Sequence, residues 1–254
     1  WDADVDIQAK VSIVGGFNPE LPKAPELYID GGGGRDALRE LYGNNVVDGL
    51  REELTLALQS ALGENWQYKL HAAAHNKDIL LVGFGEVPYE EIKATLGVLS
   101  SAGAEVRAIH ALDVVKTHVE NARDTLRASD IPNEIRLYHT DMAALPRGLT
   151  ENSNIGLVVS FSATDPEVFG VQTVDDLKNS NLAYTAKSLA SVLTPGGYIV
   201  DAYPWHLESS KKYLFPAVMR QWQSAGVNQI AYSAEKLSSD TFTGVFLKPM
   251  STEP

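Results

Sequence analysis

From residue 78 onward, short apolar runs alternate with longer segments whose apolar residues recur at helical spacing. The apolar runs lie at 79–82, 106–109, 135–138, 156–160 and 198–201. Helical spacing is clearest at 92–99, 115–126 and 182–193. Parallel strands need a long crossover connection, usually a helix, so this alternation predicts repeated βαβ units around a mainly parallel sheet.

The two ends of the chain depart from this alternation. Before residue 78, a lead-in rich in proline and glycine precedes helical periodicity that stops at Gly63, a typical residue just past a helix end. We therefore expect an irregular and helical N-terminal extension over 1–77, with no strand, and an α/β domain over 78–254. At the other end, two β-rich runs at 227–232 and 241–247 have only a short polar connection, which predicts an antiparallel hairpin at the sheet edge.

Composition narrows the classes of partner. The chain has 33 acidic and 21 basic residues, for a formal net charge of -12, which argues against binding nucleic acid. No apolar run approaches the roughly 20 residues that span a bilayer, and there is no basic segment leading into an apolar core at the N-terminus. We expect a cytoplasmic protein with a small-molecule substrate, no nucleic-acid or membrane partner, and a homodimer as the candidate assembly.

The chain offers little for metal or thiol chemistry. It contains no cysteine, which excludes thiolate zinc sites and thiol nucleophiles. His71 and His75 are four residues apart, but no third ligand is recognisable, so no metal site is expected. His118, beside an apolar helical stripe, is expected to be a helix-surface residue.

A parallel sheet binds its ligand outside the carboxyl ends of its strands. This rule selects five loops, at 83–89, 110–113, 139–142, 161–166 and 202–206. The function must be sought in these loops.

The first loop carries two closely spaced glycines and three acidic residues. Gly83 and Gly85 let the backbone approach a ligand without steric conflict. Glu86, Glu90 and Glu91 make the same turn a poor place for a pyrophosphate and a better one for a cationic or zwitterionic ligand. For an isolated pair of glycines, a plain strand-to-helix turn is an equally open interpretation.

Three segments in this order and spacing resemble the class I S-adenosylmethionine-dependent methyltransferases. They are 82–86 (VGFGE), 139–143 (HTDMA) and 193–198 (LTPGGY), and the resemblance covers about two thirds of the chain. It implies a Rossmann-like seven-stranded sheet in spatial order 3-2-1-4-5-7-6, with the last strand antiparallel. It also implies S-adenosyl-L-methionine as cofactor and methyl transfer to an oxygen or nitrogen atom of a small molecule.

The resemblance implies cofactor contacts at the ends of the first four strands of the α/β domain. They are Gly83, Phe84, Gly85, Glu86, His110, Asp113, Asp141, Met142 and Ser160. Asp141 would accept a hydrogen bond from the adenine amino group, with Met142 near the ring; the alternative for Asp141 is a turn or helix cap. His110 stands at the predicted end of the second strand, where either a ribose contact or a plain surface residue fits, and Asp113 could reach the ribose instead.

The substrate side is assigned to the last two loops and to the extension. The substrate residues predicted are Tyr28, Phe161, Ser162, Tyr203 and Trp205. Asp165 and His206 are the candidates for acid-base catalysis, although methyl transfer often needs little beyond alignment of the reactants. Tyr28, with the glycines at 31–34, could form a lid over the cofactor, or an ordinary surface loop.

Two positions depart from the family pattern and keep other functions open. Leu81 stands where the family usually has an acidic residue, and His110 stands where it usually has Asp or Glu at the end of the second strand. A neutral imidazole can replace only one of the two acceptors that a carboxylate offers to the ribose hydroxyls. One alternative is therefore a methyltransferase-fold protein that binds, serves as a scaffold or catalyses another reaction. A third candidate, an NAD(P)-dependent oxidoreductase, is disfavoured by the acidic turn and the terminal hairpin.

Overall fold

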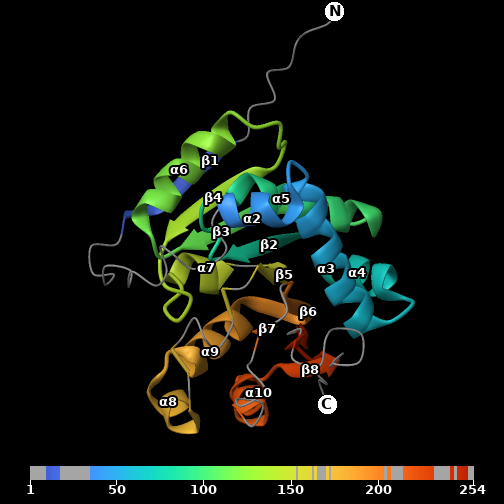
Figure 1. Ribbon diagram of the computed structural model, residues 1–254, viewed down its shortest axis with the longest axis vertical. Helices are drawn as coiled ribbons and strands as arrows, with labels where there is room; N and C mark the ends of the chain where they lie inside the picture. Colours follow the sequence, from blue (N-terminus) through green and yellow to red (C-terminus); the bar gives the residue numbers. More distant parts are fainter. Residues whose placement is uncertain are drawn as a thin grey trace, which may run out of the picture.

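The computed structural model describes residues 10–17, 35–152, 154–161, 163–164, 170–171, 173–202, 205–206, 214–231, 241–242 and 245–250. Its centre is an eight-stranded sheet in the order β1-β4-β3-β2-β5-β6-β10-β8 (Figure 1). The strands are β1 (Val11–Phe17), β2 (Lys77–Val82), β3 (Val106–Asp113), β4 (Glu134–His139), β5 (Ile155–Ser160), β6 (Leu193–Asp201), β8 (Asn228–Ala231) and β10 (Val245–Leu247). A separate pair is formed by β7 (Trp205–His206) and β9 (Thr241–Phe242).

The order of the seven strands after residue 76 is the predicted one. In chain order they are β2, β3, β4, β5, β6, β8 and β10, so the observed arrangement β4-β3-β2-β5-β6-β10-β8 reads 3-2-1-4-5-7-6. β10 runs antiparallel to both of its neighbours, whereas β2 to β6 pair in parallel. The methyltransferase-type α/β fold expected from the sequence is confirmed.

The eighth strand, β1, lies at the sheet edge and was not predicted. It pairs in parallel with β4, with Val11 opposite Ile135 and Phe17 opposite His139. Val11 is buried and Ile13 is packed against the core, while Ser12 between them is exposed, an alternation that suits an edge strand. The expectation that the extension contains no strand is therefore wrong.

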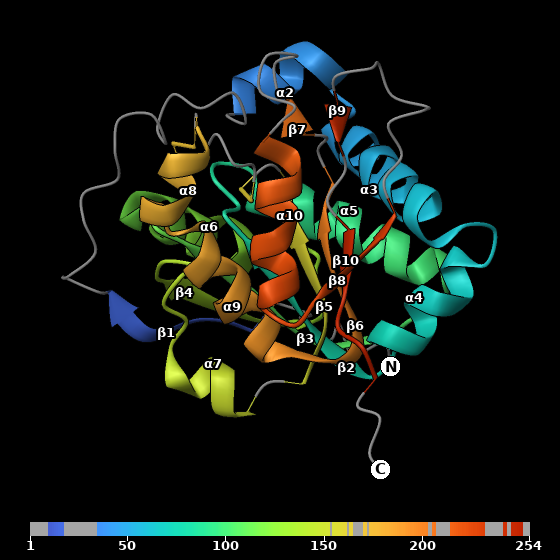
Figure 2. The same ribbon diagram turned by 90° about the horizontal axis from the view of Figure 1, so that it is seen from below.

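Helices cover both faces of the sheet, so the fold has three layers (Figures 1 and 2). On one face are α2 (Arg35–Tyr42), α3 (Val46–Leu62), α4 (Trp66–Ala74), α5 (Pro88–Ser101) and α6 (Lys116–Arg127). On the other are α7 (Arg147–Asn152), α8 (Val174–Asn179), α9 (Leu182–Val192) and α10 (Phe215–Ser224). None of the helices in the described part of the chain is long and apolar enough to cross a bilayer.

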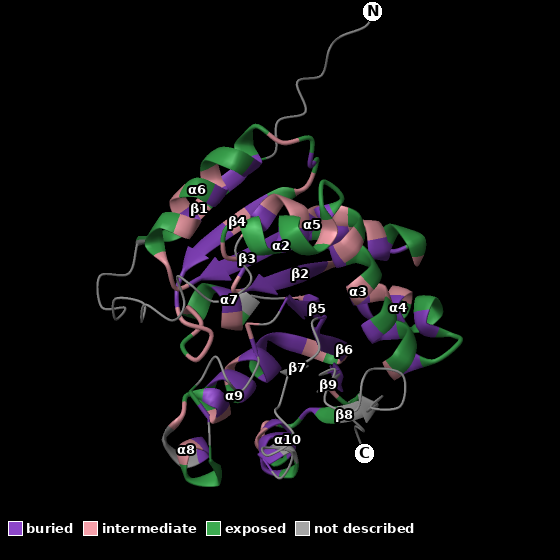
Figure 3. Cartoon of the chain, in the orientation of Figure 1, coloured by how far each residue is buried: buried purple, intermediate pink, exposed green. Residues whose placement is uncertain are grey.

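The central strands are buried on both sides, as Figure 3 shows by their colour. In β2, Ile79 and Leu81 belong to the core beneath α3 to α6, whereas Leu80 and Val82 belong to the core beneath α7 to α10. This is the continuous apolar run expected of a parallel strand with helices on both faces.

Helices of the predicted extension share this core. Leu50, Leu54 and Leu70 are fully buried in the same cluster as Leu81. Helix α4 packs so closely on β5 that a Cβ atom at Gly156 would collide with the carbonyl oxygen of Ala73.

The C-terminal part forms the predicted antiparallel closure. β8 and β10 pair with each other, and the ring of Trp222 on α10 stacks on Phe246 of β10, with ring centroids 4.5 Å apart. The run at 241–247 is not one strand, however, because Thr241–Phe242 pairs with Trp205–His206 instead.

Candidate functional site

The carboxyl ends of β2 and β5 lie side by side at the centre of the sheet, where the strand order reverses direction. Gly83 and Gly85, directly after β2, have φ values of +66° and +53°. A Cβ atom at Gly83 would collide with the Cβ atom of Ala163, after β5, whereas one at Gly85 would meet nothing within 4 Å. Gly83 therefore lets the two loops close on each other, and Gly85 leaves open space beside the loop.

A buried carboxylate stands next to this loop. β3 extends to Asp113, whose side chain is buried. Its Oδ2 accepts a hydrogen bond of 2.9 Å from the Gly85 backbone N–H, and its Oδ1 accepts one of 2.7 Å from the Val115 N–H. The second predicted strand thus ends on an acidic residue, three positions after His110.

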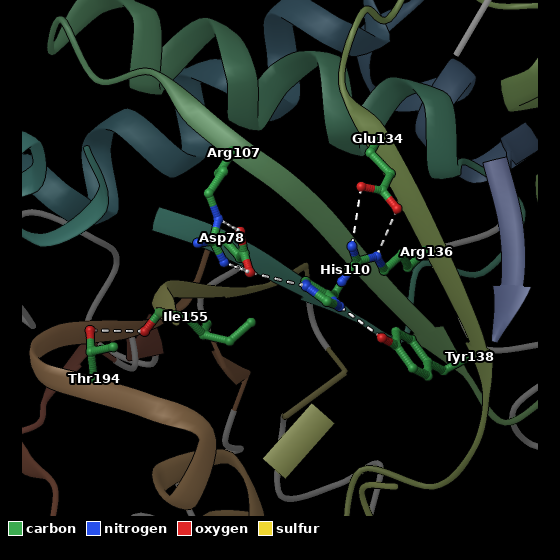
Figure 4. A network of polar contacts seen from close by, with 8 residues as sticks. All are labelled: Asp78, Arg107, His110, Glu134, Arg136, Tyr138, Ile155 and Thr194. Carbon is green, nitrogen blue, oxygen red and sulfur yellow. Dashed lines mark hydrogen bonds and ion pairs between the residues drawn. The ribbon is translucent and has the colours of Figure 1, made fainter. Parts of the chain in front are cut away.

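His110 lies inside β3 and not at its end. Its side chain is buried, with Nδ1 2.9 Å from the Tyr138 hydroxyl and Nε2 3.4 Å from Oδ2 of Asp78 (Figure 4). The strand end predicted after Ile109 is therefore wrong, and the position of His110 in the core does not support a contact with the ribose.

Asp78 is the charged centre of this core network. Arg107 donates two hydrogen bonds of 3.0 Å to its carboxylate (Figure 4). Burial alone would raise the pKa of Asp78, but the hydrogen bonds and charges of His110 and Arg107 outweigh burial and lower the pKa to about 2. The network holds β2 and β3 together and lies away from the glycine loop.

His118, on α6, faces the site and not open solvent. Its side chain is 14% exposed, and its Nδ1 lies 3.4 Å from Oδ1 of Asp113. Burial lowers the pKa of His118, but Asp113 and the charge of Glu86 outweigh this effect, so the pKa is raised overall. The expectation of a helix-surface residue is wrong, because spacing along a helix does not show which strand end the side chain will meet.

The N-terminal end of α2 contacts the glycine loop. The Arg35 backbone N–H donates to Oε2 of Glu86 at 3.2 Å, and Nη2 of Arg35 donates to the Glu86 carbonyl oxygen at 3.0 Å. Glu86 itself is exposed, whereas Phe84 turns its side chain into the core. The extension therefore returns to the loop at which a cofactor is expected.

The other cofactor candidates lie at the same edge of the sheet, where their polar side chains bond to the backbone of their own loops. Oδ1 of Asp141 accepts a hydrogen bond of 2.8 Å from the Ala143 N–H, so Asp141 caps its turn. Met142 is half-buried against the core, and Oγ of the buried Ser160 accepts a hydrogen bond of 3.2 Å from the Thr164 N–H. Their contacts with a cofactor remain predictions.

The strand ends also carry two residues that the sequence analysis did not select. Asp201, the last residue of β6, is buried, and Thr164 donates a hydrogen bond to its Oδ2. Glu91, on α5, is buried, and burial together with the charges of Asp113, Glu90 and Asp201 raises its pKa. Asp201 could have been found by including the last residue of each strand, and Glu91 by including the first turn of the following helix.

The substrate candidates are mostly untested. Phe161 is described and is buried in the hydrophobic core that also contains Phe84. The sites predicted at Tyr28, Ser162, Asp165 and Tyr203 fall outside the described residues, and for Trp205 and His206 only the backbone strand β7 is described.

Within the described ranges, no three His, Asp or Glu side chains are grouped as a metal site would need. His71 and His75 stack on each other, and each turns its Nδ1 to the backbone. Nδ1 of His71 lies 3.1 Å from the Gly103 carbonyl oxygen, and Nδ1 of His75 accepts from the Glu105 N–H at 3.2 Å.

Solved structures with a similar arrangement include several methyltransferases. One is a TehB-like SAM-dependent methyltransferase from Corynebacterium glutamicum, with 14% identity, coverage of 80% of this chain and 97% of that chain, and a TM-score of 0.44. A putative sarcosine dimethylglycine methyltransferase from Galdieria sulphuraria has 14% identity, coverage of 81% and 91%, and a TM-score of 0.48. The [4+2]-cyclase SpnF has 12% identity, coverage of 79% and 81%, and a TM-score of 0.49.

Neither the protein-family models nor the curated proteins contain a match to this sequence. The likenesses to solved structures are too distant to carry a function. The strand order identifies the fold, and the function must come from the site itself.

Proposed function

We propose that this chain is an S-adenosylmethionine-dependent methyltransferase that acts on an oxygen or nitrogen atom of a small molecule. The observation that carries the proposal is the hydrogen bond between the Gly85 N–H and Asp113. It fixes a buried carboxylate beside a glycine loop at the point of the sheet where α/β proteins bind ligands.

The residues at this point fit the cofactor. A carboxylate has about four lone-pair sites. The N–H groups of Gly85 and Val115 occupy two of them on Asp113, and Nδ1 of His118 lies 3.4 Å from Oδ1, which leaves acceptor capacity for one ribose hydroxyl. The space beside Gly85 admits a ligand close to the backbone.

The charges of the loop favour a cationic cofactor over a dinucleotide. Glu86 and Glu90 flank the turn, and opposite charges attract more strongly where water is partly excluded. When bound, S-adenosylmethionine supplies an activated methyl group on a good leaving group. The chain's own residues then have to bind and align the reactants, and Asp165 and His206 are proposed for any proton that the acceptor must lose.

A thermal-shift and calorimetric series with S-adenosylmethionine, S-adenosylhomocysteine and NAD tests the proposal. We expect saturable binding of the first two. Asp113→Asn should weaken that binding about tenfold or more, because a hydrogen bond to a charged group is worth about 1.5–3 kcal/mol. Asp124→Asn, which removes a carboxylate on the outer face of α6, is the matched control and should leave binding unchanged. Absence of heat and of any thermal shift at millimolar cofactor would refute the proposal, and tight NAD binding would replace it.

The second function is a protein of this fold that binds the cofactor or a related ligand without transferring a methyl group. It is favoured by Leu81, which is fully buried and provides no carboxylate at the strand position where the family usually has one. Turnover of S-adenosylmethionine to S-adenosylhomocysteine with a panel of amine and hydroxyl acceptors separates the two functions. Binding without turnover for any acceptor class would favour the second.

A further inference from the structure

Glu91 is a buried carboxyl group without an evident structural purpose. It lies in the first turn of α5, which begins at Pro88, and only 4% of the residue is exposed. Among the described residues, no side chain or backbone N–H donates a hydrogen bond to its carboxylate. Buried carboxylates are normally paired or hydrogen-bonded, because desolvation of a lone charge costs several kcal/mol.

The groups that face Glu91 are all acidic. They are Glu90 on its own helix, Asp113 at the end of β3 and Asp201 at the end of β6. β2 and β5 lie between β3 and β6 in the sheet. The backbone places Glu91 beside the glycine loop: the Val87 N–H donates to the Phe84 carbonyl oxygen at 3.3 Å, and the Glu91 N–H donates to the Val87 carbonyl oxygen at 3.1 Å.

Among the described residues, the nearby cationic side chains are bonded to other groups and not to Glu91. His118 is paired with Asp113, and the Arg35 guanidinium donates to the backbone carbonyl oxygen of Glu86. Burial, followed by the charges of Asp113, Glu90 and Asp201, raises the pKa of Glu91 well above its usual range. The neutral acid is therefore favoured at this position in the ligand-free protein.

Packing alone does not explain an acidic residue here. The neighbouring residues Val87, Ile92 and Leu81 are fully apolar and buried, and a leucine would fill such a position without any cost of ionisation or desolvation. Leu81 on β2 carries no charge, so the carboxyl group on this face of the sheet comes from Glu91 on α5.

We propose that Glu91 holds a proton in the ligand-free protein and releases it to solvent when the positively charged methionyl end of S-adenosylmethionine binds at the Gly83 to Gly85 loop. The inference rests on the proposed function and names the group that recognises the cofactor's cationic end. The proton leaves because a cation beside the carboxyl group favours its ionised form. By linkage, affinity for the cofactor rises with pH while Glu91 is protonated in the free protein, by up to about tenfold per pH unit.

Three ligands identify which positive group of the cofactor causes the proton release. S-adenosylmethionine carries a sulfonium and an ammonium, S-adenosylhomocysteine carries only the ammonium, and methylthioadenosine carries neither. Calorimetry of each ligand in buffers with different ionisation enthalpies measures the protons released on binding. We expect release with S-adenosylmethionine, and the response to S-adenosylhomocysteine shows whether the ammonium suffices. Methylthioadenosine should release none.

Glu91→Gln removes the ionisable proton at nearly constant shape, and Glu64→Gln, on the exposed turn between α3 and α4, is the matched control. We expect Glu91→Gln to abolish proton release, to flatten the pH dependence of affinity and to weaken S-adenosylmethionine at pH 8 about tenfold. It should weaken methylthioadenosine much less. Glu64→Gln should behave like the wild type in every respect.

The outcomes separate this inference from the proposed function. If S-adenosylmethionine binds with no proton release, or if release persists in Glu91→Gln, the inference is overturned while the cofactor assignment stands. If none of the three ligands binds at millimolar concentration, the proposed function fails and the inference fails with it. Should Glu91→Gln not fold, the buffer and pH series on the wild-type protein still decides the question.

Discussion

Replacing Asp78 by Asn should lower the free energy of unfolding at pH 7 by about 2 kcal/mol. The carboxylate lies in the buried network of Figure 4, and the partners His110 and Arg107 lower its pKa from 3.8 to about 2. Since each pKa unit is worth about 1.4 kcal/mol, the full shift corresponds to about 2.5 kcal/mol. More than half of the Arg107 side chain is exposed, so solvent screens part of its contribution, and we take about 2 kcal/mol.

The pH dependence gives this prediction its specific signature. The folded-state pKa of Asp78 is depressed, so its contribution is fully present above the unfolded value of about 3.8 and is lost as the pH falls toward 2. Urea unfolding of the wild type and Asp78→Asn at pH 7, 5 and 3 should therefore show a difference that is constant from pH 7 to 5. By pH 3 the difference should be about half as large.

The control for this experiment is Asp124→Asn, which removes an exposed carboxylate paired with Arg123 and should change stability little. A difference between the wild type and Asp78→Asn that stayed the same at all three pH values would refute the reasoning. It would mean that packing of the side chain, and not its charge, stabilises β2 against β3.

Four further substitutions test other parts of the structure. Gly83→Ala should destabilise the fold and abolish cofactor binding, because the added methyl group collides with the loop after β5. Gly85→Ala should cost only the left-handed backbone strain of about 1–2 kcal/mol. Thermal unfolding of the two variants compares these losses of stability. His118→Gln should lower the free energy of unfolding most at acidic pH. Because the folded-state pKa of His118 is raised, its pair with Asp113 stabilises the fold below about pH 6.5, and this stabilisation is lost as the pH rises through the folded pKa. An equal loss of stability at pH 6 and pH 9 would contradict this prediction. Trp222→Ala should cost about 3–5 kcal/mol in urea unfolding because the ring is fully buried, and a cost below about 1 kcal/mol would show that α10 is not part of the core.

The parallel strands were predictable because apolar runs alternate with helical stripes, whereas their order in the sheet was implied by the resemblance to the methyltransferase family. β1 was not predicted because the alternation of Val11 and Ile13 with polar positions covers only a few residues before two glycines. Such a short pattern does not indicate which strand it pairs with. Its parallel pairing with β4 is a long-range contact, which local periodicity cannot reveal.

The site was predictable in place but not in detail. The sequence selected the loops that follow β2 and β3, which pair in parallel and end at the same edge of the sheet, yet it ended the second strand at Ile109. In the structure His110 is satisfied in the core by Tyr138 and Asp78, so the strand continues to Asp113. A polar residue indicates a strand end only when the core offers it no hydrogen-bonding partner. Here the partners of His110 come from β2 and β4, which are distant in the sequence, so the sequence alone did not reveal them.

Glu91 shows the same limit on the helix side of the site. In the sequence it is one of three acidic residues at a helix start, a common feature that the helix dipole favours. Only the packing of α5 over the sheet distinguishes the buried Glu91 from the exposed Glu86.

The most direct test of the central claim is the structure of the protein in complex with S-adenosylhomocysteine. We predict that the ligand lies across the loop from Gly83 to Gly85, with one of its ribose hydroxyls within hydrogen-bonding distance of the Asp113 carboxylate. A bound ligand whose ribose is held elsewhere, with Asp113 still engaged only by Gly85, Val115 and His118, would contradict the account.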